Sequence, residues 1–310
     1  MTAPIMLPTR RRFLAASAAA VALGPSLATA TKPSAPWLRQ SVKAGMIRLG
    51  DDATWTERLK AARDAFFDGV EPSTGDDLDV DALKAAAAET GIAIDGTVGG
   101  YHWQIRHTDP DAGVRKEAAR LLRQSIEQTA ALGADTFLIV PGHGKDGDAE
   151  TVRRLAAEAI KSALPLAERL GVSILIENVW NEMFYDKDGG RDQTADDLAA
   201  FVDAFGSDRV GVQFDLGNHW KYGDVADWAR TLGKRIQKLD IKGYSRADDT
   251  FTDVGEGDID WPSVRKALAA IPFTGWVAAE VKGGYRTRLT MVNQQVEDAL
   301  RCSQPLDAIG

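Results

Sequence analysis

Residues 149–178 read AETVRRLAAEAIKSALPLAERLGVSILIEN, and this stretch decides the fold class. Its first part, Ala149–Leu170, has the periodicity of a long amphipathic helix. Gly171 follows in the position of a helix C-cap. The next run, Val172–Glu177, is mostly apolar and does not alternate, which is typical of a parallel strand covered on both faces. The stretch therefore predicts a helix followed by a buried parallel strand.

The same alternation of short apolar runs and longer helical runs repeats from residue 41 onward. Helices are predicted over stretches such as Ala112–Leu132, Ala149–Leu170 and Asp196–Phe205. Eight strands are predicted, over Ala44–Leu49, Gly69–Pro72, Ile92–Val98, Thr136–Val140, Val172–Glu177, Val210–Asp215, Ile236–Ile241 and Trp276–Val281. Eight strand–helix units in about 270 residues match a (β/α)8 TIM barrel. A doubly wound open sheet is the rival, but no Gly-x-Gly-x-x-Gly turn follows the first strand.

Composition narrows the function classes. Of the 310 residues, 44% are hydrophobic and 26% charged, as in ordinary globular proteins. The net charge is −8, and the first thirty residues contribute three arginines and no acid, so the remainder is more acidic still. This balance argues against nucleic-acid binding. The single cysteine, Cys302, excludes a disulfide framework and a thiolate metal cluster, and four histidines disfavour a histidine-rich zinc site.

The first thirty residues are typical of an export signal. Arg10-Arg11-Arg12-Phe13-Leu14 precedes a small apolar run, and Ala28-Thr29-Ala30 gives an A-x-A cleavage pattern. The apolar run is shorter than the roughly 20 residues that span a bilayer. The twin arginines resemble a twin-arginine translocation (Tat) signal, which predicts transport by the Tat machinery to the periplasm without later membrane insertion. We therefore expect a signal peptide at 1–30, a linker at 31–40 and a single catalytic barrel at 41–310.

Polar side chains follow the predicted strands, where TIM barrels carry their chemistry. Period two places Asp240 and Lys242 on one face of the seventh strand. By the same pattern Glu177, Asp215, Asp240 and Glu280 are predicted to point into the barrel mouth. Further polar and aromatic side chains fall near the predicted strand ends: Glu71, His102, Trp103, His143, Trp180, His219 and Trp220.

Four carboxylates in one partly desolvated mouth repel one another unless a cation joins them. Oxygen ligands favour a hard divalent ion, so manganese, magnesium and cobalt are the leading candidates and zinc the weaker one. The sequence thus predicts a metal site built from Glu177, Asp215, Asp240 and Glu280.

The pattern resembles the sugar phosphate isomerase/epimerase superfamily of xylose isomerase-like TIM barrels over roughly residues 41–300. The resemblance rests on Ile176-Glu177-Asn178, Phe214-Asp215-Leu216-Gly217-Asn218, Leu239-Asp240-Ile241-Lys242, residues 255–261 (GEGDIDW) and Ala279-Glu280. It implies that Glu177 and Glu280 bind the metal and shuttle a proton, with Asp215 as a further ligand. The family's strand-seven histidine is replaced here by Asp240. Three roles stay open: Asp240 ligates, Lys242 neutralises it, or His219 supplies a nitrogen ligand instead.

Such a site removes a proton next to a carbonyl, with the metal stabilising the enediolate that forms. Return of the proton on the opposite face gives epimerisation, whereas loss of a group at the β-carbon gives elimination. The leading hypothesis is a sugar isomerase or epimerase, the alternative a 3-keto-glycoside lyase or hydratase, and the non-enzyme alternative a periplasmic sugar-binding protein. Export favours a non-phosphorylated sugar or keto-sugar. Homo-oligomerisation stays open. The predicted substrate contacts are His102, Trp103, His143, Trp180, His219, Lys242 and Glu256.

Overall fold

The computed structural model describes residues 36–50 and 52–309. The predicted signal peptide and residues 31–35 of the predicted linker lie outside these ranges. Within them, no helix is both long and apolar enough to cross a membrane.

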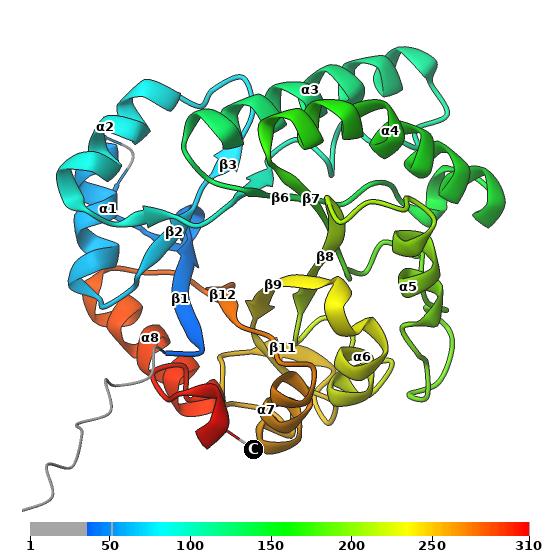
Figure 1. Ribbon diagram of the computed structural model, residues 1–310. Helices are drawn as coiled ribbons and strands as arrows, with labels where there is room; N and C mark the ends of the chain where they lie inside the picture. Colours follow the sequence, from blue (N-terminus) through cyan, green and yellow to red (C-terminus); the bar gives the residue numbers. More distant parts are fainter. Residues whose placement is uncertain (1–35, 51, 310) are drawn as a thin grey trace, which may run out of the picture. The chain divides into compact units, whose positions relative to one another are not determined.

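The described residues form a closed parallel barrel surrounded by helices (Figure 1). β12 (Gly275–Ala279) pairs in parallel with β1 (Leu38–Lys43), which closes the wall. Between them the strands follow chain order: β2 (Gly69–Glu71), β3 (Ser73–Thr74), β4 (Ala93–Ile94), β5 (Thr97–Gly99), β6 (Thr136–Ile139), β7 (Ser173–Glu177), β8 (Val210–Asp215) and β9 (Ile236–Ile241). This arrangement confirms the (β/α)8 prediction.

Two of the eight wall segments are each broken into two short strands. β2 pairs with β1 and β4, whereas β3, beyond Pro72, pairs with β5. The single strand predicted over Ile92–Val98 is likewise two strands, β4 and β5. At the break, a Cβ on Gly96 would lie 2.6 Å from Nζ of Lys238, so this glycine lets the wall pass close to a lysine inside the barrel.

The first strand begins earlier than the sequence predicted. β1 spans Leu38–Lys43, and Ala44–Met46 is a 3-10 turn (η1) rather than the start of the strand predicted over Ala44–Leu49. The prediction of a linker at 31–40 is therefore wrong for residues 38–40. The polar residues Arg39, Gln40 and Ser41 hid the strand. Ser41 lies inside the barrel and donates to Asp95, whereas the side chain of Gln40 bonds Asn293 and Glu297 on the outer side.

Eight α-helices lie within the described ranges: α1 (Trp55–Asp64), α2 (Val80–Thr90), α3 (Ala112–Ala131), α4 (Ala149–Leu170), α5 (Asp196–Asp203), α6 (Val225–Leu232), α7 (Trp261–Ala270) and α8 (Arg286–Leu300). The α4 bounds are those predicted, and α3 and α5 end one and two residues early. Acidic N-caps start several of them; Asp148, for instance, accepts a hydrogen bond from the backbone N–H of Thr151. Gly171 ends α4 in the left-handed conformation, as predicted.

After β9 the chain forms an antiparallel hairpin of β10 (Gly243–Ser245) and β11 (Thr250–Thr252). The outer face of the wall packs on the helices through buried apolar residues such as Phe214, Leu239 and Ile241, whereas the fully buried Ser41, Gln213 and Lys238 belong to the polar inner face. This polar interior supports the site from below.

Candidate functional site

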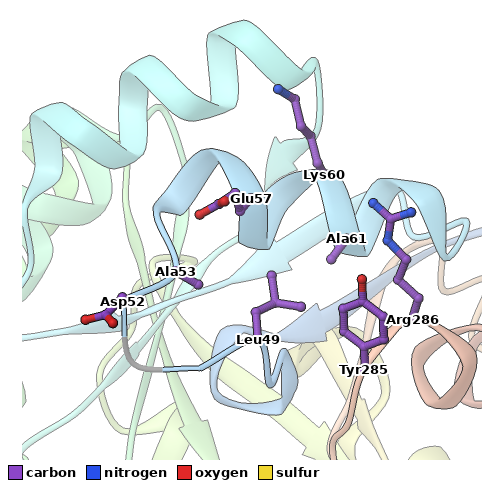
Figure 2. Close-up of a pocket in the computed structure, with 8 residues that line it drawn as sticks. All are labelled: Leu49, Asp52, Ala53, Glu57, Lys60, Ala61, Tyr285 and Arg286. Atoms are coloured by element: carbon purple, nitrogen blue, oxygen red, sulfur yellow. The ribbon is translucent and has the colours of Figure 1, made fainter.

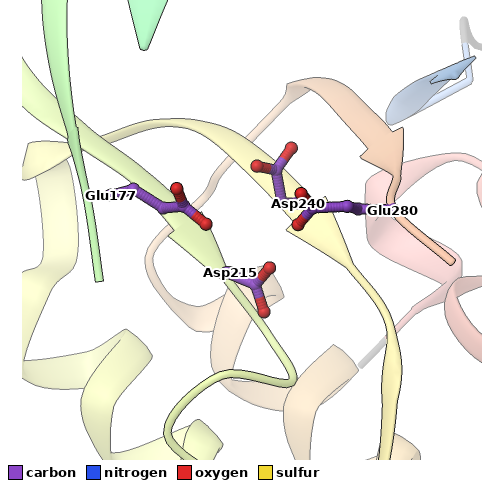
Figure 3. Close-up of side chains that lie close together, drawn as sticks. All are labelled: Glu177, Asp215, Asp240 and Glu280. Carbon is purple, nitrogen blue, oxygen red and sulfur yellow. The ribbon is translucent and has the colours of Figure 1, made fainter. Parts of the chain in front are cut away.

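Four carboxylates meet at the mouth of the barrel (Figure 3). Glu177 and Asp215 are the last residues of β7 and β8, Asp240 lies near the end of β9, and Glu280 follows β12. One oxygen from each of the four lies within 4.8 Å of the others. We call these four residues the mouth cluster. Parallel strands bring their carboxyl ends to one rim, and the β8–β9 register pairs Asp215 directly with Asp240.

Asp215 is oriented by the chain around it. Its Oδ1 accepts hydrogen bonds of 2.8 Å from the backbone N–H groups of Gly217 and Asn218. The Asn178 amide bonds both the N–H and the carbonyl of Asp215, at 2.7 and 2.9 Å. A Cβ on Gly217 would lie 2.5 Å from Cγ of Lys242, so the turn needs glycine there. These contacts leave Oδ2 directed into the mouth cluster.

Glu177 and Glu280 differ in their surroundings. Glu177 is buried and accepts a hydrogen bond of 3.1 Å from Nδ2 of Asn218. Burial, followed by the charge of Glu280, raises the pKa of Glu177 well above its usual range. The side chain of Glu280 is 40% exposed. Burial of the carboxyl opposes its ionisation, but the ammonium groups of Lys242 and Lys43 prevail and lower the pKa of Glu280.

Two lysines flank the mouth cluster. Nζ of Lys242 lies 2.7 Å from Oε2 of Glu280 and 3.0 Å from Oδ2 of Asp215. Nζ of Lys43, the last residue of β1, lies 2.9 Å from Oδ2 of Asp240 and pairs with Glu71. Lys242 therefore neutralises Asp215 and Glu280 rather than Asp240, whose cationic partner is Lys43.

A second layer of charges lies beneath the mouth cluster. Lys238 pairs with Glu71 at 2.5 Å and with Asp95 at 2.8 Å, all with side chains at most 1% exposed. We call Lys238, Glu71 and Asp95 the lower layer. The amide of Gln213 joins the two layers, donating to Asp240 at 2.8 Å and to Glu71 at 3.1 Å. Glu71, which the sequence placed near a strand end, forms ion pairs with Lys238 and Lys43 and accepts the hydrogen bond from Gln213.

The mouth cluster fits a divalent cation on three grounds. Ligand oxygens lie about 2.0–2.6 Å from a hard divalent ion, so a set within 4.8 Å can surround one. The two layers contain six carboxylates but three ammonium groups, in Lys43, Lys238 and Lys242. The buried Oδ2 of Asp215 accepts no hydrogen bond within the described residues, since Lys242 meets it only as an ion pair. The site thus has oxygen donors and excess negative charge.

The pKa values reflect the same excess of charge. Burial raises the pKa of Asp215, an effect that Lys242 reduces, and burial raises that of Asp240 to about 7 even though Lys43 opposes it. A buried carboxyl that lacks a full countercharge takes up a proton instead. A cation bound among these carboxylates would replace that proton.

His219, the alternative metal ligand, does not join the carboxylates. Its ring is buried and stacks on Trp228, with centroids 4.6 Å apart. Nδ1 lies 3.3 Å from the Asn178 amide that holds Asp215. Burial lowers the pKa of His219 to about 3, so the ring is neutral at physiological pH. The structure brings Asp240, and not His219, to the other three carboxylates.

The other predicted substrate contacts divide into buried and open side chains. His102 is buried, accepts a hydrogen bond of 3.3 Å from the N–H of Val140, and has a pKa lowered by burial to about 3. His143 is half-buried and its Nδ1 accepts from the N–H of Lys145. Trp103 is 42% exposed and Glu256 is exposed. Trp180 is half-buried and donates its indole N–H to the carbonyl of Asn218.

Sequence reasoning missed Lys43, Gln213 and the orienting roles of Asn178 and Asn218. Lys43 was missed because the first strand was placed six residues too late. The signal was present: period two from Ser41 puts Lys43 inside the barrel at the end of its strand. Period two from Asp215 also puts Gln213 inside the barrel, but its two contacts are with residues 142 and 27 positions away, which no sequence pattern gives.

A concave region of about 450 Å³ lies elsewhere, between α1 and the start of α8 (Figure 2). It is lined by Leu49, Asp52, Ala53, Glu57, Lys60, Ala61, Tyr285 and Arg286. None of these residues belongs to the mouth cluster or the lower layer, so this groove is separate from the candidate site.

Fold and site together define a TIM barrel with an acidic mouth. The chain belongs to the xylose isomerase-like TIM barrel family, whose model matches residues 59–305. It is 25% identical over 178 residues to the uncharacterized protein MJ1311 of Methanocaldococcus jannaschii, covering 54% of this chain and 58% of that protein.

Two further similarities have names that state an activity. The chain is 26% identical over 250 residues to the putative L-ribulose-5-phosphate 3-epimerase SgbU of Escherichia coli, covering 73% of this chain and 83% of that protein. Its fold matches the 3-keto-D-glucoside 4-epimerase YcjR of E. coli with a TM-score of 0.68 and 15% identity, over 86% of this chain and 100% of the other.

Proposed function

We propose that the protein is a metal-dependent sugar epimerase or isomerase that removes a proton next to a carbonyl. The observation that carries the proposal is the arrangement of Glu177 and Glu280. The wall order β7-β8-β9-β12 puts these glutamates on opposite sides of the Asp215–Asp240 pair, as Figure 3 shows. Two carboxylates facing one centre from two sides are what epimerisation needs, since one takes the proton and the other returns it.

Glu177, Asp215, Asp240 and Glu280 would hold the ion, for which manganese, magnesium and cobalt are the leading candidates and zinc the weaker one. A divalent ion bound there supplies Lewis-acid stabilisation of the negative charge that develops on the substrate carbonyl oxygen. The remaining functions belong to side chains of this chain. Asn218 orients Glu177 through its 3.1 Å hydrogen bond, and Lys242 directs Oε2 of Glu280 through its 2.7 Å contact.

The test replaces each glutamate by its amide, which accepts no proton. Glu177→Gln and Glu280→Gln should each lower turnover of a keto-sugar by at least about 10²-fold with metal saturating. In deuterated solvent, each single variant should still exchange the proton of the one epimer whose face its remaining glutamate serves. Glu150→Gln, an exposed carboxylate on α4, is the matched control. Near-normal turnover by either metal-loaded variant would refute the two-glutamate mechanism.

The same site permits elimination, so a 3-keto-glycoside lyase or hydratase is the second candidate. The fold similarity to a 3-keto-D-glucoside 4-epimerase motivates keto-glycosides as test substrates. Release of the aglycone from such a glycoside identifies the lyase, and solvent-proton exchange without release identifies the epimerase. Sugar binding with neither exchange nor release would instead identify a binding protein.

Export to the periplasm is the third part of the proposal. Arg10-Arg11-Arg12-Phe13-Leu14 and Ala28-Thr29-Ala30 support a Tat signal cleaved before Thr31. Tat transports folded proteins, so the barrel would bind its metal before export. A location in the periplasm also favours a non-phosphorylated sugar as substrate. Replacing Arg10 and Arg11 by lysine should retain the chain in the cytoplasm. Periplasmic protein that still begins before Thr31 on N-terminal sequencing would contradict cleavage there.

A further inference from the structure

A pair of stacked aromatic rings lies beside the mouth cluster. Trp180 follows Glu177 by three residues, and Phe251 lies in β11 of the hairpin after β9. Their ring centroids are 4.9 Å apart with an interplanar angle of 32°. We call Trp180 and Phe251 the aromatic pair. Phe251 remains 42% exposed.

The aromatic pair is held rigidly. Tyr244 is fully buried, faces Phe251 across the hairpin, and packs edge-on against both rings, at 5.3 Å from Phe251 and 5.8 Å from Trp180. Its hydroxyl donates to Asp249. Trp180 is fixed by its indole hydrogen bond to the carbonyl of Asn218. Rings already fixed in position lose little entropy when a ligand stacks on them.

The aromatic pair is connected to Glu177 and Glu280 through one residue each. Nζ of Lys242 lies 5.1 Å from the centroid of the Phe251 ring and 2.7 Å from Glu280. Asn218, which accepts from Trp180, donates to Glu177. The Lys242 ammonium therefore lies within contact of both the Phe251 ring and the carboxylates of Glu280 and Asp215. Past this ammonium, a group that extends from a sugar held at the mouth cluster reaches Phe251.

We propose that the aromatic pair is a subsite for an apolar ring joined to the reacting sugar, so that the substrate is a glycoside with an aromatic aglycone rather than a free sugar. This inference rests on the proposed function, since it takes the reacting sugar to lie at the mouth cluster. Aromatic rings favour offset stacking with other flat rings. A lone exposed phenylalanine needs no explanation by itself; rigidity and adjacency to the carboxylates set Phe251 apart.

The test compares phenyl and methyl 3-keto-β-D-glucosides with the metal-loaded protein. Phe251→Ala is the informative change, because Phe251 is exposed, whereas changing Trp180 would also disturb Asn218. We expect Phe251→Ala to lower kcat/KM and affinity for the phenyl glycoside about tenfold and to leave the methyl glycoside within twofold. Phe251→Tyr keeps the aromatic ring and should therefore keep the preference for the phenyl over the methyl glycoside. Tyr285→Ala, in another exposed aromatic residue outside the site, should change neither.

Glycoside affinity measured by calorimetry tests the subsite independently of turnover, so the subsite and the proposed reaction can fail separately. If neither glycoside is turned over but Phe251→Ala still weakens phenyl-glycoside binding selectively, the subsite stands and the proposed reaction fails. Turnover of both glycosides with an unchanged phenyl-to-methyl ratio in Phe251→Ala overturns the subsite alone. Equal losses for both substrates, or no binding of the phenyl glycoside to the unaltered protein, also overturn it.

Discussion

Glu71 in the lower layer and Asp240 in the mouth cluster are both fully buried carboxylates, but their pKa values shift in opposite directions. In the lower layer, burial would raise the pKa of Glu71, but Lys238 and Lys43 outweigh it and hold that pKa at about 2. In the mouth cluster, four carboxylates share Lys242 and one contact from Lys43, and burial raises the pKa of Asp240 to about 7. The number of ammonium groups at each carboxyl decides the difference. Glu71 contacts two, Lys238 and Lys43, whereas Asp240 contacts Lys43 alone. Asp95, which contacts Lys238 alone, also has its pKa raised by burial.

The largest loss of stability is expected when the buried lysine of the lower layer is replaced. Lys238→Met leaves Glu71 and Asp95 short of a buried cation, and removing one partner of a buried ion pair costs about 3–5 kcal/mol. Urea unfolding of the metal-free protein measures the loss. Glu280→Gln, at the 40% exposed edge of the mouth cluster, should cost less than about 1 kcal/mol. Equal losses in the two variants would mean that the layers are not energetically distinct.

A second prediction concerns metal affinity. The Lys242 ammonium lies among the proposed ligands, and like charges a few ångströms apart repel by several kcal/mol at an effective dielectric constant of about 20. Lys242→Met should therefore bind Mn²⁺ about ten- to a hundredfold more tightly by calorimetry. Lys161→Met, on the exposed face of α4, is the matched control and should bind as the unaltered protein does. Weaker binding by Lys242→Met would mean that this lysine supports the metal site rather than competing with the ion.

Hydrophobic runs were enough to predict the barrel but not its polar strands. Apolar runs such as Val210–Asp215 and Ile236–Ile241 match β8 and β9 at both ends. The first strand was displaced because Arg39, Gln40 and Ser41 interrupt its apolar pattern. Breaks within the second and third strands depend on Pro72 and on the approach of Gly96 to Lys238. Such close approaches arise from residues far apart in sequence, and periodicity carries no information about them.

The carboxylates of the candidate site were predictable because each ends or nearly ends a strand. Strand ends meet at one rim in any parallel barrel, so position in the sequence implies proximity in space. Lys43 and Gln213 act through contacts across the barrel, which depend on register and side-chain length. His219 shows the converse: it follows Asp215 by four residues, yet its ring turns away to stack on Trp228.

Acid should weaken metal binding to the mouth cluster. The pKa of Asp240 is raised to about 7, and a ligand must lose its proton before it binds. Below pH 7 the proton competes, so Mn²⁺ affinity should fall about tenfold per pH unit. Acid has the opposite effect on the stability of the metal-free protein. Because the folded state binds a proton at Asp240 that the unfolded chain releases, the free energy of unfolding should rise as pH falls from 7 towards 4. Asp240→Asn should weaken both trends, in calorimetry and in urea unfolding, and the remainder belongs to Glu177 and Asp215, whose pKa values are also raised. Unchanged trends would assign the whole titration to those groups.

The smallest predicted effect is a change of metal preference at Asp240. Asp240→His replaces a charged oxygen ligand by a neutral imidazole and so lowers the negative charge of the mouth cluster by one. Nitrogen ligands suit zinc better than manganese or magnesium, so the ratio of Zn²⁺ to Mn²⁺ affinity should rise several-fold, up to about tenfold. Asp240→His also removes the ion pair with Lys43, so Lys43→Met is the matched control. Lys43→Met removes the same ion pair but keeps Asp240, and it should change the ratio of Zn²⁺ to Mn²⁺ affinity little. The assignment would be wrong if Asp240→His left the ratio unchanged while His219→Ala lost the metal. That outcome requires the buried His219 ring to leave Trp228, which the 4.6 Å stacking opposes.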